Sequence, residues 1–236
     1  MKLHLHCEHA WNLSPEEAVQ VQERLRQQVV VQALPEGELR RVGGVDVSFD
    51  EQRAWGAVVT LDYVTQRPLE YAVAEVPLTF PYIPGLLSFR EAPAILAAMA
   101  RLNALPDVFI VDGQGLAHPR RFGIASHLGV LLDMPTIGCA KSILVGKHRP
   151  LGEEVGSMAE LVSEGEVLGM ALRMKSKVAP VYVSVGHRVD LPSAVRIIMG
   201  CGRDYRLPEP IRLAHRLATS AKTQPSAPTL FDHLIL

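Results

Sequence analysis

Three acidic residues in this sequence have surroundings that suit chemistry. Asp46 lies within an apolar stretch, Glu91 lies where a helix pattern begins, and Asp112 ends an apolar run. Burying a carboxylate without partners costs several kcal/mol, so a carboxylate in an apolar strand must reach solvent or bind something. If the three converge, their oxygens would bind Mg²⁺ or Mn²⁺. Such an ion can activate water and stabilise charge on a phosphodiester, so a metal-dependent phosphodiesterase is one interpretation of the pattern. Three unrelated acidic residues without a shared site are the other.

The segment that contains Asp112 reads Pro106-Asp-Val-Phe-Ile-Val-Asp-Gly-Gln-Gly-Leu-Ala-His-Pro119. Residues 107–111 are rich in apolar, β-branched side chains, which is typical of a buried strand. Sites in α/β folds lie at the carboxyl ends of central strands, and glycines there let backbone N–H groups approach a ligand closely. An isolated Asp-Gly would more often be a turn or a helix cap. Here the further carboxylates and a basic flank favour a site.

A proline-rich loop at residues 77–84 could present an aromatic side chain to a nucleobase. Its prolines stiffen the chain and are predicted to hold Phe80, Tyr82 and Ile83 in an exposed, extended segment. Such a loop suits a wedge or a stacking platform for a base. A loop whose aromatic packs on the core has the same pattern, so both interpretations stay open at this point.

The elements that must position these residues follow from the sequence pattern. Ser14-Pro15-Glu16-Glu17 predicts a capped helix start, and the helix should extend to about residue 32. Glu91 can be the third residue of a second capping box opened by Ser88, or a carboxylate that points from a helix entrance into a site. An antiparallel meander is predicted at residues 41–49, 55–63 and 69–76. Further strands are expected at 107–111, 135–139, 167–174 and 178–185, and further helices at 88–103, 122–132, 191–199 and 210–219.

This order of elements predicts an α/β fold with a single domain. A mixed five-stranded central sheet would be flanked by helices in a ribonuclease H-like layout. Residues 146–166 show little periodicity and are predicted to form a loop. We assign residues 1–222 to the domain and residues 223–236 to a flexible C-terminal tail, whose first half is rich in Gln, Pro, Ser and Ala.

Composition narrows the class of protein and its partners. The 236 residues are 48% hydrophobic and contain no apolar run of the ~20 residues that a membrane span needs. The three cysteines have no paired spacing, and the N-terminus lacks a signal-peptide pattern, so we expect a soluble cytoplasmic protein without membrane contact. Residues 113–150 carry five basic and one acidic residue (+4), and residues 168–222 carry ten and three (+7). These blocks suggest a local anionic partner, although solvated helix faces often have the same charges.

Several motifs together resemble one known family. They are Val45-Asp-Val-Ser48, Phe80-Pro-Tyr-Ile-Pro-Gly85 with Phe89-Arg-Glu91, Asp112-Gly-Gln-Gly-Leu-Ala-His-Pro-Arg-Arg-Phe-Gly123, Gly138-Cys-Ala-Lys141 and Val185-Gly-His187. The chain resembles endonuclease V from about residue 10 to residue 220. The resemblance implies a ribonuclease H-like nuclease that uses Mg²⁺, with Mn²⁺ as a possible substitute, on DNA that contains deoxyinosine. It implies hydrolysis of the second phosphodiester bond 3′ to deoxyinosine, which leaves 3′-hydroxyl and 5′-phosphate ends.

The resemblance also implies roles for individual residues. Asp46 and Asp112 would be metal ligands, with Glu91 completing the acidic site, and Lys141 and His215 would lie beside the scissile phosphate. The wedge that replaces the extruded base would be Tyr82. The residues near the base would be Gly85, Gly113 and Gly115, and His118 is grouped with them without an assigned role. Extrusion is plausible because hypoxanthine pairs weakly.

Other interpretations remain at this point. A non-catalytic nucleic-acid-binding module could share the fold, although acidic groups in a phosphate groove weaken binding unless a metal neutralises them. A nucleotide-binding domain would need a glycine-rich loop that the chain lacks. Single-stranded nucleic acid or RNA could also be substrates. The apolar end of the tail, with Pro228-Thr-Leu-Phe231, could fold back on the core or on a second copy of the chain, or contact a sliding clamp.

Overall fold

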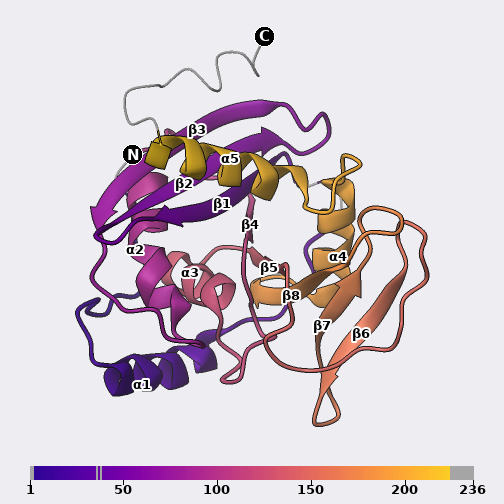
Figure 1. The fold of residues 1–236 in the computed structure, drawn as a ribbon, viewed down its shortest axis with the longest axis horizontal. Helices are drawn as coiled ribbons and strands as arrows, with labels where there is room; N and C mark the ends of the chain where they lie inside the picture. Colours follow the sequence, from indigo (N-terminus) through magenta and orange to yellow (C-terminus); the bar gives the residue numbers. More distant parts are fainter. Residues whose placement is uncertain (1–2, 36, 38, 224–236) are drawn as a thin grey trace.

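One mixed β-sheet runs through the part of the chain that the computed structural model describes, which is residues 3–35, 37 and 39–223. Its eight strands have the order β3-β2-β1-β4-β5-β8-β7-β6 (Figure 1). Their bounds are β1 Arg41–Phe49, β2 Arg53–Asp62, β3 Pro68–Pro77, β4 Val108–Val111, β5 Thr136–Ala140, β6 Met158–Ser163, β7 Glu166–Leu172 and β8 Val181–His187. The helices are α1 Pro15–Leu25, α2 Leu87–Met99, α3 Ile124–Leu132, α4 Leu191–Gly200 and α5 Glu209–Thr223, with a short 3₁₀ turn at Arg26–Gln28.

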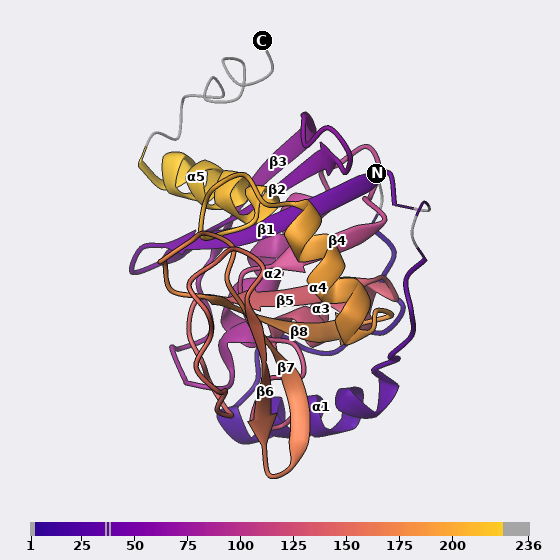
Figure 2. The ribbon, with the colours of Figure 1, turned by 90° about the vertical axis from the view of Figure 1, so that its right-hand side faces the viewer.

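The central strand β4 divides the core between the two faces of the sheet. Its side chains alternate, as the period of two in a strand requires. Val108 and Ile110 belong to the cluster that packs under α4 and α5. Phe109 and Val111 belong to the cluster under α2 and α3 on the opposite face (Figure 2). All four side chains are buried, which is why this strand has no polar positions.

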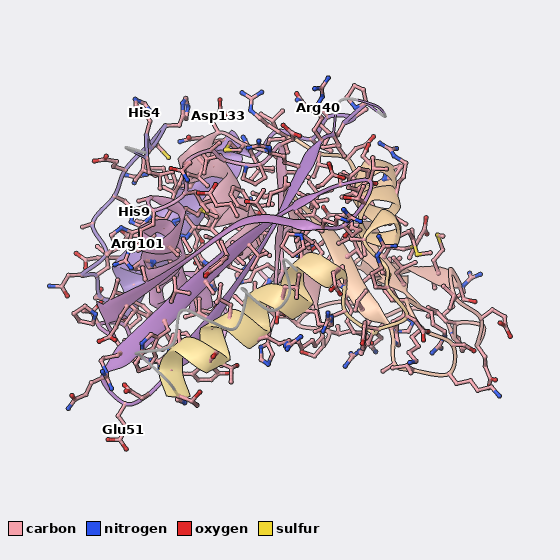
Figure 3. All side chains as sticks on the ribbon, turned by 90° about the horizontal axis from the view of Figure 1, so that it is seen from above. His4, His9, Arg40, Glu51, Arg101 and Asp133 are labelled. Carbon is pink, nitrogen blue, oxygen red and sulfur yellow. The ribbon has the colours of Figure 1, made fainter. Side chains whose placement is uncertain are left out.

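Two glycines allow helices to lie unusually close to the sheet. A Cβ at Gly44 in β1 would lie 2.2 Å from the backbone of Pro210 at the start of α5. A Cβ at Gly56 in β2 would lie 2.2 Å from the carbonyl oxygen of Ala94 in α2. Helix α5 therefore crosses β1 and β2 on one face, as the view from above shows (Figure 3). Helix α2 packs on β2 from the other face.

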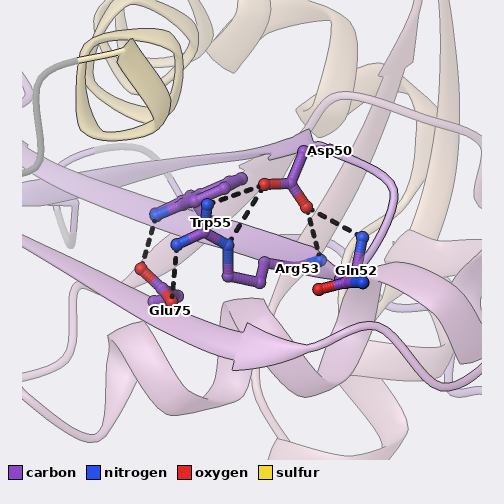
Figure 4. Close-up of polar contacts among 5 residues, drawn as sticks. All are labelled: Asp50, Gln52, Arg53, Trp55 and Glu75. Carbon is purple, nitrogen blue, oxygen red and sulfur yellow. Dashed lines mark hydrogen bonds and ion pairs between the residues drawn. The ribbon is translucent and has the colours of Figure 1, made fainter.

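The turn between β1 and β2 is held by its own side chains (Figure 4). One oxygen of Asp50 accepts hydrogen bonds from the backbone N–H groups of Gln52 and Arg53, at 2.8 and 2.7 Å. The guanidinium of Arg53 contacts Asp50 and Glu75, and Glu75 also accepts a hydrogen bond from the indole of Trp55 at 3.0 Å. These contacts tie the turn to β3 and help to set the register of the meander.

The structure confirms the predicted meander (β1 to β3), the predicted hairpin (β7 and β8) and the α/β class. The predicted number of strands in the sheet, five, was wrong. Residues 158–163 form β6, in the segment that we expected to be a loop. Its pattern was hidden because β6 is an edge strand in which Leu161 is the one fully buried residue. The residues Glu164 and Gly165, both with positive φ, make the two-residue turn into β7. The hairpins extend the predicted five-stranded sheet to eight strands.

Two helix predictions were also wrong in detail. The first helix ends at Leu25 and is followed by the 3₁₀ turn at Arg26–Gln28. The β-branched residues that begin at Val29 then favour extended backbone, and Val30 bonds to the end of β8. Helix α2 begins at Leu87, so Glu91 is not the third residue of a capping box. The helix continues through Pro93, because the buried face around Phe89 and Met99 offsets the ~3 kcal/mol that an internal proline costs.

Two further expectations concern the ends and the surroundings of the chain. The tail beyond Thr223 lies outside the described residues, so its predicted flexibility and its clamp contact stay predictions. Within residues 3–35, 37 and 39–223, no helix is long and apolar enough to cross a membrane.

Candidate active site

A pocket of about 330 Å³ opens at the carboxyl end of β4. This volume lies in the range of ~300–1,000 Å³ that is usual for ligand sites. Its wall is made by α1, the proline-rich loop, α2, the segment after β4 and the segment after β5. Seven of the ten residues predicted for the site line it: Tyr82, Gly85, Glu91, Asp112, Gly113, His118 and Lys141.

The acidic residues converge because of the sheet register. Strands β1 and β4 are parallel, and Val45 pairs with Val111. The next residues, Asp46 and Asp112, therefore lie side by side at the same edge of the sheet. Glu91 arrives from α2, which packs closely over Gly56, and it interacts electrostatically with both aspartates.

Burial and mutual repulsion raise the free energy of the ionised carboxylates in this cluster. Burial, together with the charges of Asp46 and Asp112, raises the pKa of Glu91 to about 8. Burial and the neighbouring Asp112 also raise the pKa of Asp46. Carboxyl groups with raised pKa values in a cleft are typical of functional sites. A cation bound beside these carboxylates would favour their ionised forms and lower the repulsion among them.

Two basic side chains already touch the aspartates. Lys141 follows β5, which is parallel to β4, and its ammonium forms an ion pair with Asp112. Burial lowers the pKa of Lys141, but the Asp112 carboxylate more than compensates, so the net shift is upward. From α5, His215 places Nδ1 at 2.6 Å from an Asp46 oxygen. The backbone carbonyl of Lys141 accepts a hydrogen bond from Arg206, which fixes the segment after β5.

The acidic cluster suits a hard divalent ion by its chemistry. Within the described residues, no three His, Cys, Asp or Glu side chains are grouped tightly enough to hold a metal as they stand. Lys141 and His215 each engage one of the aspartates instead. The donor set still fits the ion, because Asp46, Glu91 and Asp112 offer only carboxylate oxygens and carry excess negative charge.

The other end of the pocket is built around one backbone carbonyl. Gly85, with φ of +81°, accepts hydrogen bonds from Gln22 at 3.0 Å, His118 at 3.0 Å and Arg120 at 2.7 Å. The Nδ1 atom of His118 accepts from the Arg120 backbone N–H, so Nε2 carries the proton that is donated to Gly85. Burial and the charge of Arg120 lower the pKa of His118 to about 4, which keeps the ring neutral. This is the structural role of His118 that the motif alone did not indicate.

The proline-rich loop presents one aromatic side chain and buries another. Tyr82 is 68% exposed at the pocket, which confirms its predicted exposure, and its role as a wedge stays a prediction. Phe80 is 3% exposed, so the prediction that it would be exposed was wrong. It packs against Phe89, and its carbonyl accepts a hydrogen bond from Arg90 at 2.8 Å. The loop is therefore anchored at Phe80 and at Gly85, with Tyr82 between the two anchors.

Gly115 lies behind the pocket and is not one of the residues that line it. A Cβ there would lie 1.9 Å from the carbonyl oxygen of Val185 in β8. Its N–H donates to the hydroxyl of Ser184 at 2.9 Å. The second glycine of the motif thus allows close packing of backbone on backbone, whereas Gly113 lines the pocket itself.

The sequence profile of the endonuclease V family matches residues 23–216 of this chain. The chain belongs to the endonuclease V family. It is 54% identical to the endonuclease V of Gloeobacter violaceus over 212 residues, which cover 88% of this chain and 86% of that protein. The endonuclease V of Streptomyces avermitilis has a similar structure, with a TM-score of 0.88, 41% identity, and coverage of 96% of this chain and 100% of that one.

A third similar structure is a complex with DNA. Endonuclease V from Ciona intestinalis was crystallised with a 24mer DNA that contains an inosine followed by a ribo-adenosine. It matches this chain with a TM-score of 0.77 and 30% identity, over 89% of this chain and 98% of that one. These likenesses confirm the predicted family, the fold and the class of enzyme, which is an endonuclease.

Sequence reasoning missed several residues of this endonuclease V site. Gln22, Gln114 and Ser142 line the pocket, and Arg120 and Arg206 hold its backbone in place. Arg120 lies within the motif that contains Asp112, which was a usable signal. Gln22 is a glutamine in an amphipathic helix, where its type and spacing do not distinguish it from a surface residue.

Proposed function

We propose that this chain is a Mg²⁺-dependent endonuclease that recognises deoxyinosine in DNA. It would hydrolyse the second phosphodiester bond 3′ to the lesion and leave 3′-hydroxyl and 5′-phosphate ends. The main support is the pocket itself, which joins an acidic end at Asp112 to a backbone-walled end at Gly85, with the exposed Tyr82 at the same opening. The inosine-containing DNA in the Ciona intestinalis complex supports the choice of substrate.

The base-recognition end would hold an extruded hypoxanthine. Extrusion of a weakly paired base costs less than extrusion of a normal one, and Tyr82 would stack in the gap that the base leaves. The pocket wall at Gly85 and Gly113 is backbone, because glycine has no side chain. The edge of a bound base can therefore approach the backbone of these two residues closely. The neutral His118 donates its Nε2 proton to the Gly85 carbonyl and so helps to hold this backbone wall in place.

The acidic end would carry out hydrolysis. Asp46, Asp112 and Glu91 would hold Mg²⁺, or Mn²⁺ in its place, and the bound ion would supply activation of water and stabilisation of charge on the phosphate. Water adds to phosphorus and the bond from phosphorus to the 3′ oxygen breaks, so that this oxygen leaves as a hydroxyl. The ammonium of Lys141 neutralises charge on a phosphate oxygen. With Nδ1 bonded to Asp46, His215 has Nε2 available for a proton at the reacting water.

The test is cleavage of an end-labelled duplex with a single deoxyinosine. With Mg²⁺ we expect one nick on the inosine strand, two bonds 3′ to the lesion, with ends that a ligase can rejoin. The matched duplex with deoxyadenosine and the reaction in EDTA should remain uncut. A duplex that is cut equally with either base, or cut equally in EDTA, would contradict the proposal.

Further preferences follow from the same assay. The same assay with single-stranded inosine DNA or with inosine-containing RNA in place of the duplex measures whether these are also substrates.

The free cysteines Cys7, Cys139 and Cys201 support a reducing compartment such as the cytoplasm as the place of action.

A further inference from the structure

Gln22 connects helix α1 to two walls of the pocket. Its side chain is 1% exposed, although the residue lies on a helix whose neighbouring Gln20 is exposed. The amide nitrogen donates to the carbonyl of Gly85 at 3.0 Å and to the carbonyl of Phe122 at 3.2 Å. Gly85 directly follows the proline-rich loop, and Phe122 lies two residues before the first residue of α3, Ile124. One amide group therefore links the loop that carries Tyr82 to the wall beside Gly123.

The orientation of this amide is determined by its partners. Its oxygen accepts a hydrogen bond from Nε of Arg120 at 2.6 Å. A flipped amide would place that oxygen against two carbonyl oxygens and its N–H groups against a guanidinium. Arg120 in turn donates from Nη2 to the same Gly85 carbonyl, at 2.7 Å. Gln22 and Arg120 thus form a closed ring of hydrogen bonds around one acceptor.

The geometry points to Gln22 as a positioning residue for recognition of the base, a role that rests on the proposed function. A buried hydrogen-bonded network specifies one arrangement of the groups it joins. By holding the carbonyl of Gly85, Gln22 fixes the backbone wall against which the base would lie and one anchor of the loop that presents Tyr82. Preorganised contacts of this kind improve discrimination between ligands, because less order has to be gained on binding.

Gln22 has no part in the hydrolysis itself. It lies at the Gly85 end of the pocket, and its hydrogen bonds go to Gly85, Phe122 and Arg120 rather than to the acidic residues. It is also one residue before the segment that the family profile matches. Its loss should therefore change which duplex is bound, and leave the rate of the bound complex nearly intact.

The test compares Gln22→Met with Gln20→Met, which changes an exposed glutamine on the same helix. Binding is measured in EDTA with an inosine duplex and with the same duplex lacking inosine, and cleavage is measured with Mg²⁺ at saturating enzyme. For Gln22→Met we expect about ten-fold weaker binding of the inosine duplex, which is about 1.4 kcal/mol. Binding of the normal duplex should stay within two-fold of wild type and the cleavage rate within three-fold. Gln20→Met should match the wild type throughout.

Arg120→Met and the double variant supply the second measurement. Discrimination is the ratio of the affinities for the inosine duplex and the normal duplex. Because both side chains hold one carbonyl, this ratio in the double variant should lie within about three-fold of the ratio in the more impaired single variant. Multiplicative losses would show that Gln22 and Arg120 act independently, which would overturn their joint role at Gly85. Equal losses on both duplexes would show that Gln22 only stabilises the fold. If Gln22→Met lowers the melting temperature sharply, both duplexes are compared at a temperature well below its midpoint, where the variant is folded. A wild-type enzyme without preference for inosine would instead refute the proposed function.

Discussion

At the scale of single residues, we expect the acidic cluster to be needed for cleavage of the DNA but not for its binding. Asp112→Asn and Asp46→Asn each remove one charge from the proposed ion site without touching the base-recognition end. We expect cleavage of inosine DNA to fall below detection while binding of the same DNA in a gel-shift assay stays measurable. Turnover retained in Asp112→Asn would show that the site lies elsewhere.

His118 gives the fold a sensitivity to acid. Burial, followed by the charge of Arg120, lowers its pKa from 6.5 to about 4 in the folded protein. Below pH 6.5 this histidine is protonated in the unfolded chain but stays neutral in the folded protein. Its contribution to the free energy of unfolding is therefore fully present above pH 6.5 and is lost as pH falls toward 4. The difference of about 2.5 pH units corresponds to about 3 kcal/mol at the acid end.

His118→Gln tests this account, because glutamine can still donate to Gly85 but does not titrate. Urea unfolding at pH 7 and pH 4.5 should show a loss of stability that is smaller by about 2–3 kcal/mol in this variant than in the wild type. His4→Gln, at an exposed position, should leave the difference unchanged. Equal pH dependence in wild type and His118→Gln would mean that the imidazole is not held neutral.

At the scale of elements, the proline-rich loop acts through its two anchors and one free ring. Tyr82→Ala removes the exposed ring and leaves the anchors at Phe80 and Gly85 in place. Discrimination between inosine and normal duplex should fall by about 1–3 kcal/mol if stacking carries it. Tyr82→Phe, which keeps the ring, should behave like the wild type. Equal loss of affinity for both duplexes in Tyr82→Ala would make this residue structural.

The close approach of α2 to the sheet decides where Glu91 lies. In Gly56→Ala the new Cβ would meet the Ala94 carbonyl at 2.2 Å, so α2 has to move. We expect a loss of about 1–3 kcal/mol of unfolding free energy together with reduced cleavage. Gly165→Ala is the comparison, since its φ is +82° and nothing lies within 4 Å of the new atom. It should cost about 1–2 kcal/mol from backbone strain alone and leave cleavage unchanged.

At the scale of the whole molecule, ion binding should be visible as stability. An ion that binds only the folded state raises the melting temperature, and the stabilisation grows with the logarithm of one plus the ratio of the ion concentration to its Kd. We expect Mg²⁺ to raise it relative to EDTA, because the ion would relieve repulsion among Asp46, Glu91 and Asp112. Asp112→Asn should abolish most of the rise. The same rise in that variant would assign the effect to ions bound elsewhere.

Much of this architecture was predictable because local patterns and long-range packing agree. The apolar run before Asp112 could only be a buried strand, and the motifs around Tyr82 and Lys141 identified the pocket. The failures have physical causes. Strand β6 buries one residue fully, so it lacks a strong period, and Phe80 turns inward because Phe89 offers it a surface. Gln22 and Gly115 act through contacts with distant segments, which no local pattern encodes.

The pairing of His215 with Asp46 has a further consequence, because 169 positions separate them along the chain. The acidic residues themselves come from β1, α2 and the end of β4, so no contiguous stretch contains the site. Proteins that are rich in contacts of large sequence separation fold slowly, because a long loop has to close before such a contact forms. A chain that is misfolded, or still collapsing, therefore lacks the means to break a phosphodiester. We therefore expect nuclease activity to return during refolding only once β1, α2, β4 and α5 have packed together.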